Sequence, residues 1–197
     1  MSRNNIYYII YKPYKVLTQF TNEGENPGLA SVYTLPKDVY PVGRLDLDSE
    51  GLLILTNNKS LNAKLLHPDQ QHFRSYWVEV EGVPSEASLN QMRAGLEINI
   101  KGAYQTLPCE VKVIDTPGVE ERTPPVNSLK HPVRSWLEIK LSEGKNRQVR
   151  RMTASIGHPT LRLIRVAIED LMVFPLKPGG ITQISEKALY KKLKIID

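Results

Sequence analysis

Three carboxylates and one arginine lie in the glycine-bounded segment Gly43–Gly51. The acids are Asp46, Asp48 and Glu50, and Arg44 precedes the first of them by two positions. Carboxylates can bind a metal, attack as nucleophiles or move protons, and a nearby guanidinium favours their ionised form. The apolar run that follows predicts a buried strand, which would fix the segment in place. We therefore expect a chemical site at this turn.

Two metal-dependent functions can be compared with this pattern. A calcium loop needs a bidentate acid at its twelfth position, which here is Asn57, so a calcium site is not supported. A magnesium-dependent phosphatase needs an Asp-x-Asp pair, which Asp46 and Asp48 could supply. Its aspartates are expected at the end of an apolar strand, whereas here the apolar run comes after them. The phosphatase stays an alternative, as does a non-catalytic RNA-binding protein.

The same segment resembles a motif of a known enzyme family. Residues 43–57 are similar over fifteen positions to the second motif of the pseudouridine synthases that act on small- and large-subunit ribosomal RNA. Four other segments resemble family motifs in the family's order: Tyr11–Leu17, Arg74–Gly82, Glu143–Met152 and Leu161–Val166. Thr56–Asn58 and the loop 121–134 are similar to the E-type branch, which acts on large-subunit RNA.

The resemblance implies both a fold and a reaction. It implies an α+β catalytic domain with a central, mainly antiparallel mixed sheet flanked by helices, and isomerisation of uridine to pseudouridine in 23S ribosomal RNA. We expect one such domain over residues 1–197, either undivided or made of two subdomains that share a sheet. Because the first motif begins near residue 6, the N-terminal S4 RNA-binding module of most relatives is not expected. No cofactor is implied, and a monomer is expected.

The resemblance also implies roles for individual residues. Asp46 would be the catalytic aspartate, Arg150 would pair with it and hold it ionised, and Tyr76 would stack on the extruded uracil. Leu163 would line the substrate pocket. RNA contacts are expected from a set of basic residues: Arg44, Lys12, Lys145, Arg147, Arg151, Arg162 and Arg165. Asp48 and Glu50 are expected to cap the turn and carry surface charge.

Composition and charge agree with an RNA partner. The chain has 26 basic and 21 acidic residues, and the stretch from Lys145 to Arg165 contains no acid, as expected of a phosphate-binding surface. The single cysteine, Cys109, excludes an intrachain disulfide, and the four histidines lack zinc-helix spacing, so no metal is expected. No apolar run approaches the ~20 residues of a membrane span, so we expect a cytoplasmic protein.

Periodicity predicts helices and strands in mixed order, which is typical of an α+β fold. Strands are expected at 6–11, 51–56, 75–81, 106–114, 135–141 and 160–168, and helices at 59–66, 85–95, 146–156 and 185–195. The proline-rich segment 120–134 is expected to be a surface loop.

Two basic segments have different expected environments. Projection of the helix 146–156 places Val149, Met152, Thr153 and Ile156 on one face and Arg147, Arg150, Arg151 and Ala154 on the other. The three guanidinium groups are therefore expected to share one surface. The lysines near the C-terminus have no motif around them and are expected to be solvated: Lys187, Lys191, Lys192 and Lys194.

Overall fold

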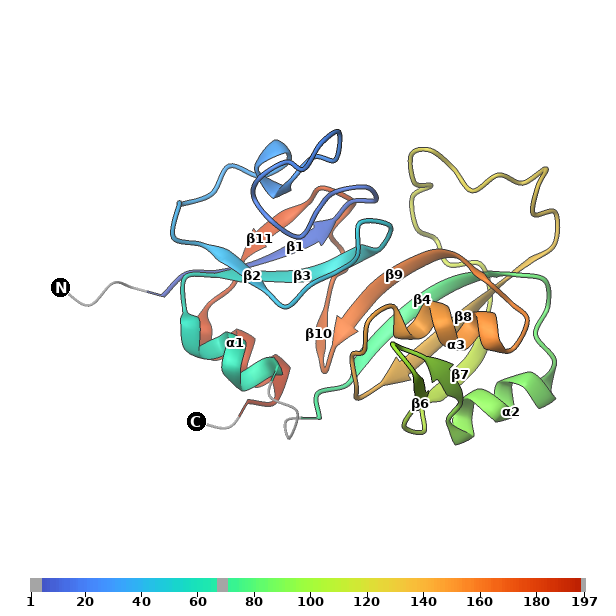
Figure 1. The fold of residues 1–197 in the computed structure, drawn as a ribbon. Coiled ribbons are helices and arrows are strands. Elements are labelled where there is room, and N and C mark those ends of the chain that lie inside the picture. The colour runs from blue at the N-terminus through green and yellow to red at the C-terminus, as the bar shows by residue number, and fades with distance from the viewer. Residues whose placement is uncertain (1–4, 67–70, 196–197) are drawn as a thin grey trace. The chain divides into compact units, whose positions relative to one another are not determined.

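The chain divides into two compact units, which Figure 1 shows as a ribbon. The computed structural model describes residues 5–66 and 71–195. Unit 1 is formed by residues 1–72 together with residues 165–197, and unit 2 is the continuous segment Phe73–Ile164. The chain therefore leaves unit 1 after His72 and returns to it at Arg165. None of the helices in the described part of the chain has the length and apolar character that a membrane crossing requires.

The sheet of unit 1 is centred on two long strands that pair in antiparallel fashion. Its strands are β1 (Tyr7–Lys12), β2 (Tyr40–Val42), β3 (Glu50–Thr56), β10 (Leu171–Met172), β11 (Ile181–Gln183) and the last residues of β9 (Thr160–Ile168). β1 pairs along its whole length with β3, from Tyr7 opposite Thr56 to Lys12 opposite Gly51. β11 covers the other edge of β1, with Ile181 opposite Ile10. The pairing therefore brings the first motif beside the strand that follows the Asp46 turn.

The described part of unit 1 contains two α-helices. These are α1 (Lys59–Leu66) and α4 (Glu186–Leu193), and a 3-10 turn, η1, covers Leu29–Ser31. The Ser185 hydroxyl caps α4 by accepting from the Ala188 amide at 3.3 Å, which satisfies one free N–H of the first turn. α4 buries Leu189, Tyr190 and Leu193, and the Tyr190 ring meets the Tyr7 ring edge-on with centroids 6.3 Å apart.

The strands of unit 2 are also antiparallel. They are β4 (Arg74–Glu81), β5 (Glu97–Asn99), β6 (Ala103–Gln105), β7 (Glu110–Ile114) and β8 (Arg134–Leu141). β8 pairs with β4 on one side and β7 on the other, while β5 and β6 form a separate hairpin. Tyr76, Val78 and Val80 alternate along β4 and are all buried in one apolar cluster, as expected for a strand with one face on the core.

Unit 2 contains the helices α2 (Glu86–Ala94) and α3 (Gln148–Ser155). α2 starts at a Ser85 cap and ends at Gly95, whose φ is +94° and where a Cβ atom would lie 2.5 Å from the Thr106 carbonyl oxygen. Only glycine fits there. α3 buries Val149, Met152 and Thr153, which confirms the predicted apolar face.

The predicted α+β fold with a mainly antiparallel sheet is confirmed, with differences at the level of single elements. The predicted strand 106–114 is wrong in its first part, since β7 begins at Glu110. Pro108 has no N–H to donate, and the Leu107 N–H is bonded to the Glu143 carboxylate instead of a strand. The sequence did not predict β2, β5, β6, β10 or β11, because each has only two or three residues.

Candidate active site

The turn that carries Asp46 is bonded from both sides to the loop after β1. The Thr18 hydroxyl accepts from the Leu45 N–H at 3.1 Å and donates to the Leu45 carbonyl at 2.6 Å. On the other side of Asp46, the Lys15 N–H donates to the Leu47 carbonyl at 2.9 Å. The backbone at Asp46 is thus fixed at both neighbouring residues, while the Asp46 side chain itself is only half-buried.

Lys12, the last residue of β1, is fully buried and shapes the loop that holds this turn. Its ammonium donates to the Val16 carbonyl at 2.6 Å and to the Pro13 carbonyl at 3.0 Å. Burial lowers the pKa of Lys12 to about 8, and the negative charge of Glu50 opposes that shift. The RNA contact predicted for Lys12 does not fit, because a buried ammonium bonded to carbonyls cannot reach a phosphate.

The start of β3 is packed closely against β9 within unit 1. Gly51 has a φ of +104°, and a Cβ atom there would lie 2.2 Å from the Arg165 carbonyl oxygen, so no larger residue fits. The Arg165 side chain is 5% exposed, and its Nε donates to the Leu52 carbonyl at 2.9 Å. The RNA contact predicted for Arg165 therefore does not fit its position. Glu50 is 1% exposed, so the predicted surface role of this acid is also wrong.

Tyr76 and Leu163 belong to the apolar cluster of unit 2. Tyr76 is 9% exposed and Leu163 is 5% exposed, and the same cluster includes Val149 of α3. Nearly complete burial is compatible with a core role and with the wall of an apolar pocket. The stacking role of Tyr76 and the pocket role of Leu163 therefore stay predictions.

The basic residues around α3 do not share one solvent-facing surface. Arg147 has left-handed φ and ψ angles of 52° and 31° and precedes α3 as its N-cap, so the helical projection does not apply to it. Arg151 donates through Nε to the Asn146 carbonyl at 3.1 Å and through Nη1 to the Asn99 carbonyl. Arg150 is half-buried. The predicted three-arginine face is thus wrong: Arg147 is exposed, whereas Arg151 ties α3 to β5.

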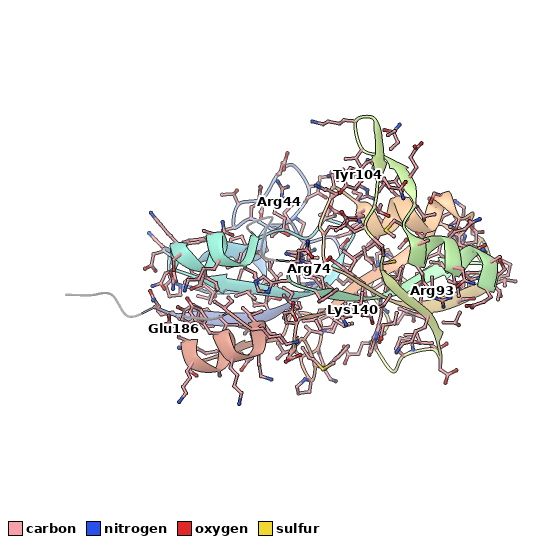
Figure 2. The ribbon with its side chains drawn as sticks, turned by 90° about the horizontal axis from the view of Figure 1, so that it is seen from below. Arg44, Arg74, Arg93, Tyr104, Lys140 and Glu186 are labelled. Carbon is pink, nitrogen blue, oxygen red and sulfur yellow. The ribbon has the colours of Figure 1, made fainter. Side chains whose placement is uncertain are left out.

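The remaining predicted RNA contacts differ in exposure. Arg44 of unit 1 is exposed (Figure 2). Lys145 is also exposed, and its ammonium lies 5.0 Å from the centroid of the Tyr104 ring. Arg162 is only 5% exposed, so a direct phosphate contact does not fit it. Of the predicted RNA contacts, the exposed cations that could reach a phosphate are therefore Arg44, Lys145 and Arg147.

Glu143 forms a network that the sequence did not predict. Its carboxylate accepts from the Tyr104 hydroxyl at 2.6 Å, the Leu107 N–H at 2.8 Å and the Gln148 side-chain amide. The hydrogen bond to Glu143, aided by burial, raises the pKa of Tyr104 to about 12. The network joins the β5–β6 hairpin to the start of α3. Two of its partners lie 36 and 39 residues from Glu143, so no local pattern could reveal it.

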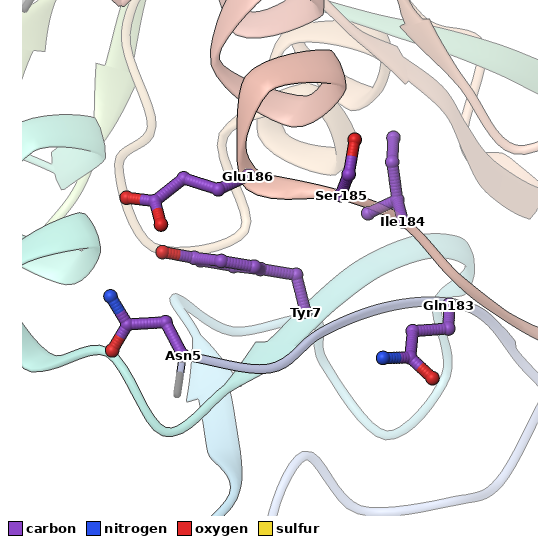
Figure 3. Close-up of a pocket in the computed structure, with 6 residues that line it drawn as sticks. All are labelled: Asn5, Tyr7, Gln183, Ile184, Ser185 and Glu186. Atoms are coloured by element: carbon purple, nitrogen blue, oxygen red, sulfur yellow. The ribbon is translucent and has the colours of Figure 1, made fainter. Parts of the chain in front are cut away.

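An open hollow of about 590 Å³ lies at the start of α4, and Figure 3 shows its lining. The lining residues are Asn5, Tyr7, Gln183, Ile184, Ser185 and Glu186. The Tyr7 hydroxyl accepts from the Asn58 side-chain amide at 2.7 Å, and burial raises the Tyr7 pKa. None of the predicted site residues lines this hollow.

Comparison with known proteins decides the family. The model of the RNA pseudouridylate synthase family matches residues 6–155, a span that contains the Asp46 turn, Tyr76 and Arg150. The chain belongs to this family. The enzyme class predicted from the sequence is thereby confirmed.

The chain is similar to named members of this family over most of its length. The chain is 46% identical to ribosomal large subunit pseudouridine synthase E of Vibrio parahaemolyticus, over 90% of the chain and 73% of the relative. It is 44% identical to the enzyme of the same name from Xanthomonas axonopodis pv. citri, over 86% and 89% of the two chains. Identity to ribosomal large subunit pseudouridine synthase B of Bacillus subtilis is 30%, over 91% and 68%.

Solved structures agree on the fold. The chain is similar to a crystal structure of a pseudouridylate synthase with a TM-score of 0.79 and 21% identity, covering 96% of this chain and 74% of that one. The human RNA pseudouridylate synthase domain containing 1 protein gives a TM-score of 0.58 and 13% identity, covering 98% and 93%. At these identities the likeness supports the fold alone.

Proposed function

We propose that this protein converts specific uridines of large-subunit ribosomal RNA to pseudouridine, acting as a monomer in the cytoplasm. The observation that carries the proposal is the family match over residues 6–155. The choice of large-subunit RNA is supported by the names of the relatives that are 43–46% identical to this chain.

The reaction breaks the N1–C1′ bond of the nucleotide and forms a C5–C1′ bond. The N1 atom gains a proton and C5 loses one, so the atoms balance without an oxidant or a cofactor. The target base must leave its stack to reach the enzyme, at a cost of a few kcal/mol. We assign the catalytic carboxylate to Asp46, which acts as a nucleophile or as a base at the 2′ position. Both routes need a carboxylate in a fixed place, and the bonds from Thr18 and Lys15 to the neighbouring residues supply that restraint.

Two residues of unit 2 complete the proposed chemistry. We assign stacking on the extruded uracil and removal of the C5 proton to Tyr76, whose ring and hydroxyl suit these tasks. Arg150 would hold the carboxylate of Asp46 ionised during the reaction, because a guanidinium offers a permanently charged, planar fork. The assignment of this pair rests on the family resemblance.

RNA contacts in this proposal come from the exposed cations. Lys145 and Arg147 would bind backbone phosphates, which position the RNA without reading its sequence. Arg44, two residues before Asp46, would fill the space left by the extruded base.

The test is detection of pseudouridine by carbodiimide labelling and primer extension. Unmodified large- and small-subunit RNAs are incubated separately with the protein, with and without EDTA. We expect new stops at few positions of the large-subunit RNA and an equal yield in EDTA. Product only in the small-subunit RNA would overturn the choice of substrate, and absence of product in both RNAs would overturn the proposed reaction.

A further inference from the structure

Two helices of unit 1 are rich in lysine and poor in acid. α1 has two lysines and no acid, and α4 has three lysines and one glutamate. Their sixteen residues therefore carry a net charge of +4, against +5 for all 197 residues. This net charge marks a second basic part of the chain, in addition to the acid-free segment between Lys145 and Arg165.

The two helices are in contact, and the contact shows which lysines lie on the same side. The Lys64 ammonium lies 5.1 Å from the centroid of the Tyr190 ring, and the Asn58 amide donates to the Tyr190 hydroxyl at 3.4 Å. Tyr190 therefore marks the side of α4 that faces α1. At 100° per residue, Lys187 is about 60° and Lys191 about 100° from Tyr190 around the axis, whereas Lys192 is about 160° away. Figure 1 shows both helices on the same side of the strands of unit 1.

We name Lys59, Lys64, Lys187 and Lys191 the lysine face. All four side chains are exposed, and among the described residues none of their ammonium groups is paired with a carboxylate. Lys194 differs, because it binds Glu169 and Asp170 at 3.1 Å each and is therefore left out of the face. Ammonium groups without an acidic partner remain available to an external anion.

The lysine face is connected to the Asp46 turn. The Asn62 side chain of α1 accepts from the Gly43 N–H at 3.3 Å, just before Arg44. Lys59 lies three residues before Asn62, so it occupies the same side of α1. The basic surface of unit 1 thus begins beside the turn and continues over α1 to α4.

We propose that the lysine face binds the phosphate backbone of the RNA that flanks the target uridine. The proposal rests on the proposed function, because the RNA is the polyanion that the Asp46 turn receives. A protein partner would be expected to bury apolar side chains at the centre of its interface. None of the large apolar side chains that are exposed in the described residues lies on α1 or α4. The chemistry of the face therefore fits a backbone contact, in which each lysine neutralises a phosphate.

The experiment is a titration of a large-subunit RNA fragment at several salt concentrations. The variant carries Lys59→Gln, Lys64→Gln, Lys187→Gln and Lys191→Gln together, and thermal unfolding checks that it is folded. The slope of log Kd against log salt should fall by about 3, since each phosphate contact contributes about 0.7 to 0.9. Turnover at saturating RNA should stay that of the wild type, because none of these residues takes part in the chemistry.

A matched pair of single variants tests the geometry. Lys191→Gln should lower the slope by about one contact, whereas Lys192→Gln, the next residue but on the far side of α4, should leave it unchanged. Equal losses in the two variants would show an unspecific charge effect and overturn the proposal, as would a wild-type slope in the fourfold variant. A wild-type slope in the fourfold variant would instead indicate that the lysine face binds an acidic protein. A wild type that binds RNA but forms no pseudouridine would refute the proposed function alone.

Discussion

Thr18 and Leu45 are joined by two hydrogen bonds through a single hydroxyl group. The Thr18 Oγ1 accepts from the Leu45 amide at 3.1 Å and donates to the Leu45 carbonyl at 2.6 Å, across 27 residues of sequence. Because Leu45 directly precedes Asp46, the backbone of the proposed catalytic residue cannot shift without breaking both bonds. Thr18 therefore acts on Asp46 through position and not through contact with the substrate.

Replacement of Thr18 tests that relationship. Thr18→Val keeps the shape of the side chain and loses both hydrogen bonds, so turnover at saturating RNA should fall about tenfold as Asp46 moves from its place. The Kd for RNA should change little. Thr18→Ser retains the hydroxyl and should recover most of the turnover. Equal turnover in the Val and Ser variants would show that the two bonds do not position Asp46.

Asp46 itself is the next test. Asp46→Asn keeps the size of the side chain and loses the anion, so pseudouridine formation should disappear while RNA affinity stays within a few-fold. Asp48→Asn is the matched control two residues away and should reduce activity only mildly. Product yields from carbodiimide labelling give the comparison. Measurable turnover in the Asp46 variant, with loss in the Asp48 variant, would move the catalytic role to Asp48.

The role of Arg150 can be separated from phosphate binding. If its guanidinium supports the anion of Asp46, Arg150→Met should reduce turnover by about two orders of magnitude or more, with little change in RNA affinity. Arg150→Lys should recover only part of the loss, because a point charge does not reproduce a planar fork. Turnover and Kd are measured side by side. Normal turnover with weakened binding would instead identify Arg150 as a phosphate contact.

The structure gives Arg147 and Arg151 different roles, and alanine variants should distinguish them. Arg147→Ala should leave stability unchanged and lower the salt slope of RNA binding by about one contact, since its side chain is exposed. Arg151→Ala removes bonds to the Asn99 and Asn146 carbonyls and should lower the free energy of unfolding by about 1 to 2 kcal/mol. Denaturant unfolding and salt titration of both variants provide the measurements. The assignment fails if Arg147→Ala is the destabilised protein.

Lys12 should make stability depend on pH in the alkaline range. Its pKa is lowered by burial from the model-peptide value of 10.5 to about 8 in the folded protein. Between these values the unfolded chain binds more protons than the folded chain, so stability rises as pH rises from 8 to 10.5. The shift corresponds to roughly 3 kcal/mol in total, at 1.36 kcal/mol per pH unit.

A neutral variant isolates this contribution. Lys12→Met removes the titrating group, so the difference in unfolding free energy between wild type and variant should grow with pH across this window. Lys37→Met removes an exposed lysine and serves as the control. A difference between wild type and Lys12→Met that stays constant from pH 8 to 10.5 would contradict the burial of a charged ammonium.

Sequence patterns predicted the elements that have a clear period. The apolar face of α3 follows from the spacing of Val149, Met152 and Thr153, and β4 follows from its alternation. The fifteen residues from Gly43 to Asn57 were enough to identify the family, because such a long run of specified residues rarely recurs by chance. Periodicity therefore predicted the fold class, and the motif residues predicted the family.

Contacts with backbone carbonyl groups determined what the sequence could not show. The family resemblance placed Lys12 among the RNA contacts, yet two carbonyl oxygens of the following loop hold its ammonium inside unit 1. Arg151 was expected on a shared arginine face, but the hairpin carbonyl of Asn99 occupies its guanidinium. In each case the partner is a backbone carbonyl. Every residue has one, so the residue types do not show which carbonyl will accept a hydrogen bond.

The division of the chain has a consequence for its synthesis. Unit 2 is one continuous segment, so all of it has been made before the ribosome reaches β11 and α4. β1 is translated long before the strand that covers its edge, since Ile10 lies opposite Ile181. During translation the nascent chain therefore carries an uncovered strand edge at its beginning, which is the kind of surface that recruits other chains. The edge of β1 in unit 1 can be covered only after β11 has been made, and a chain that stops short of β11 keeps that edge open.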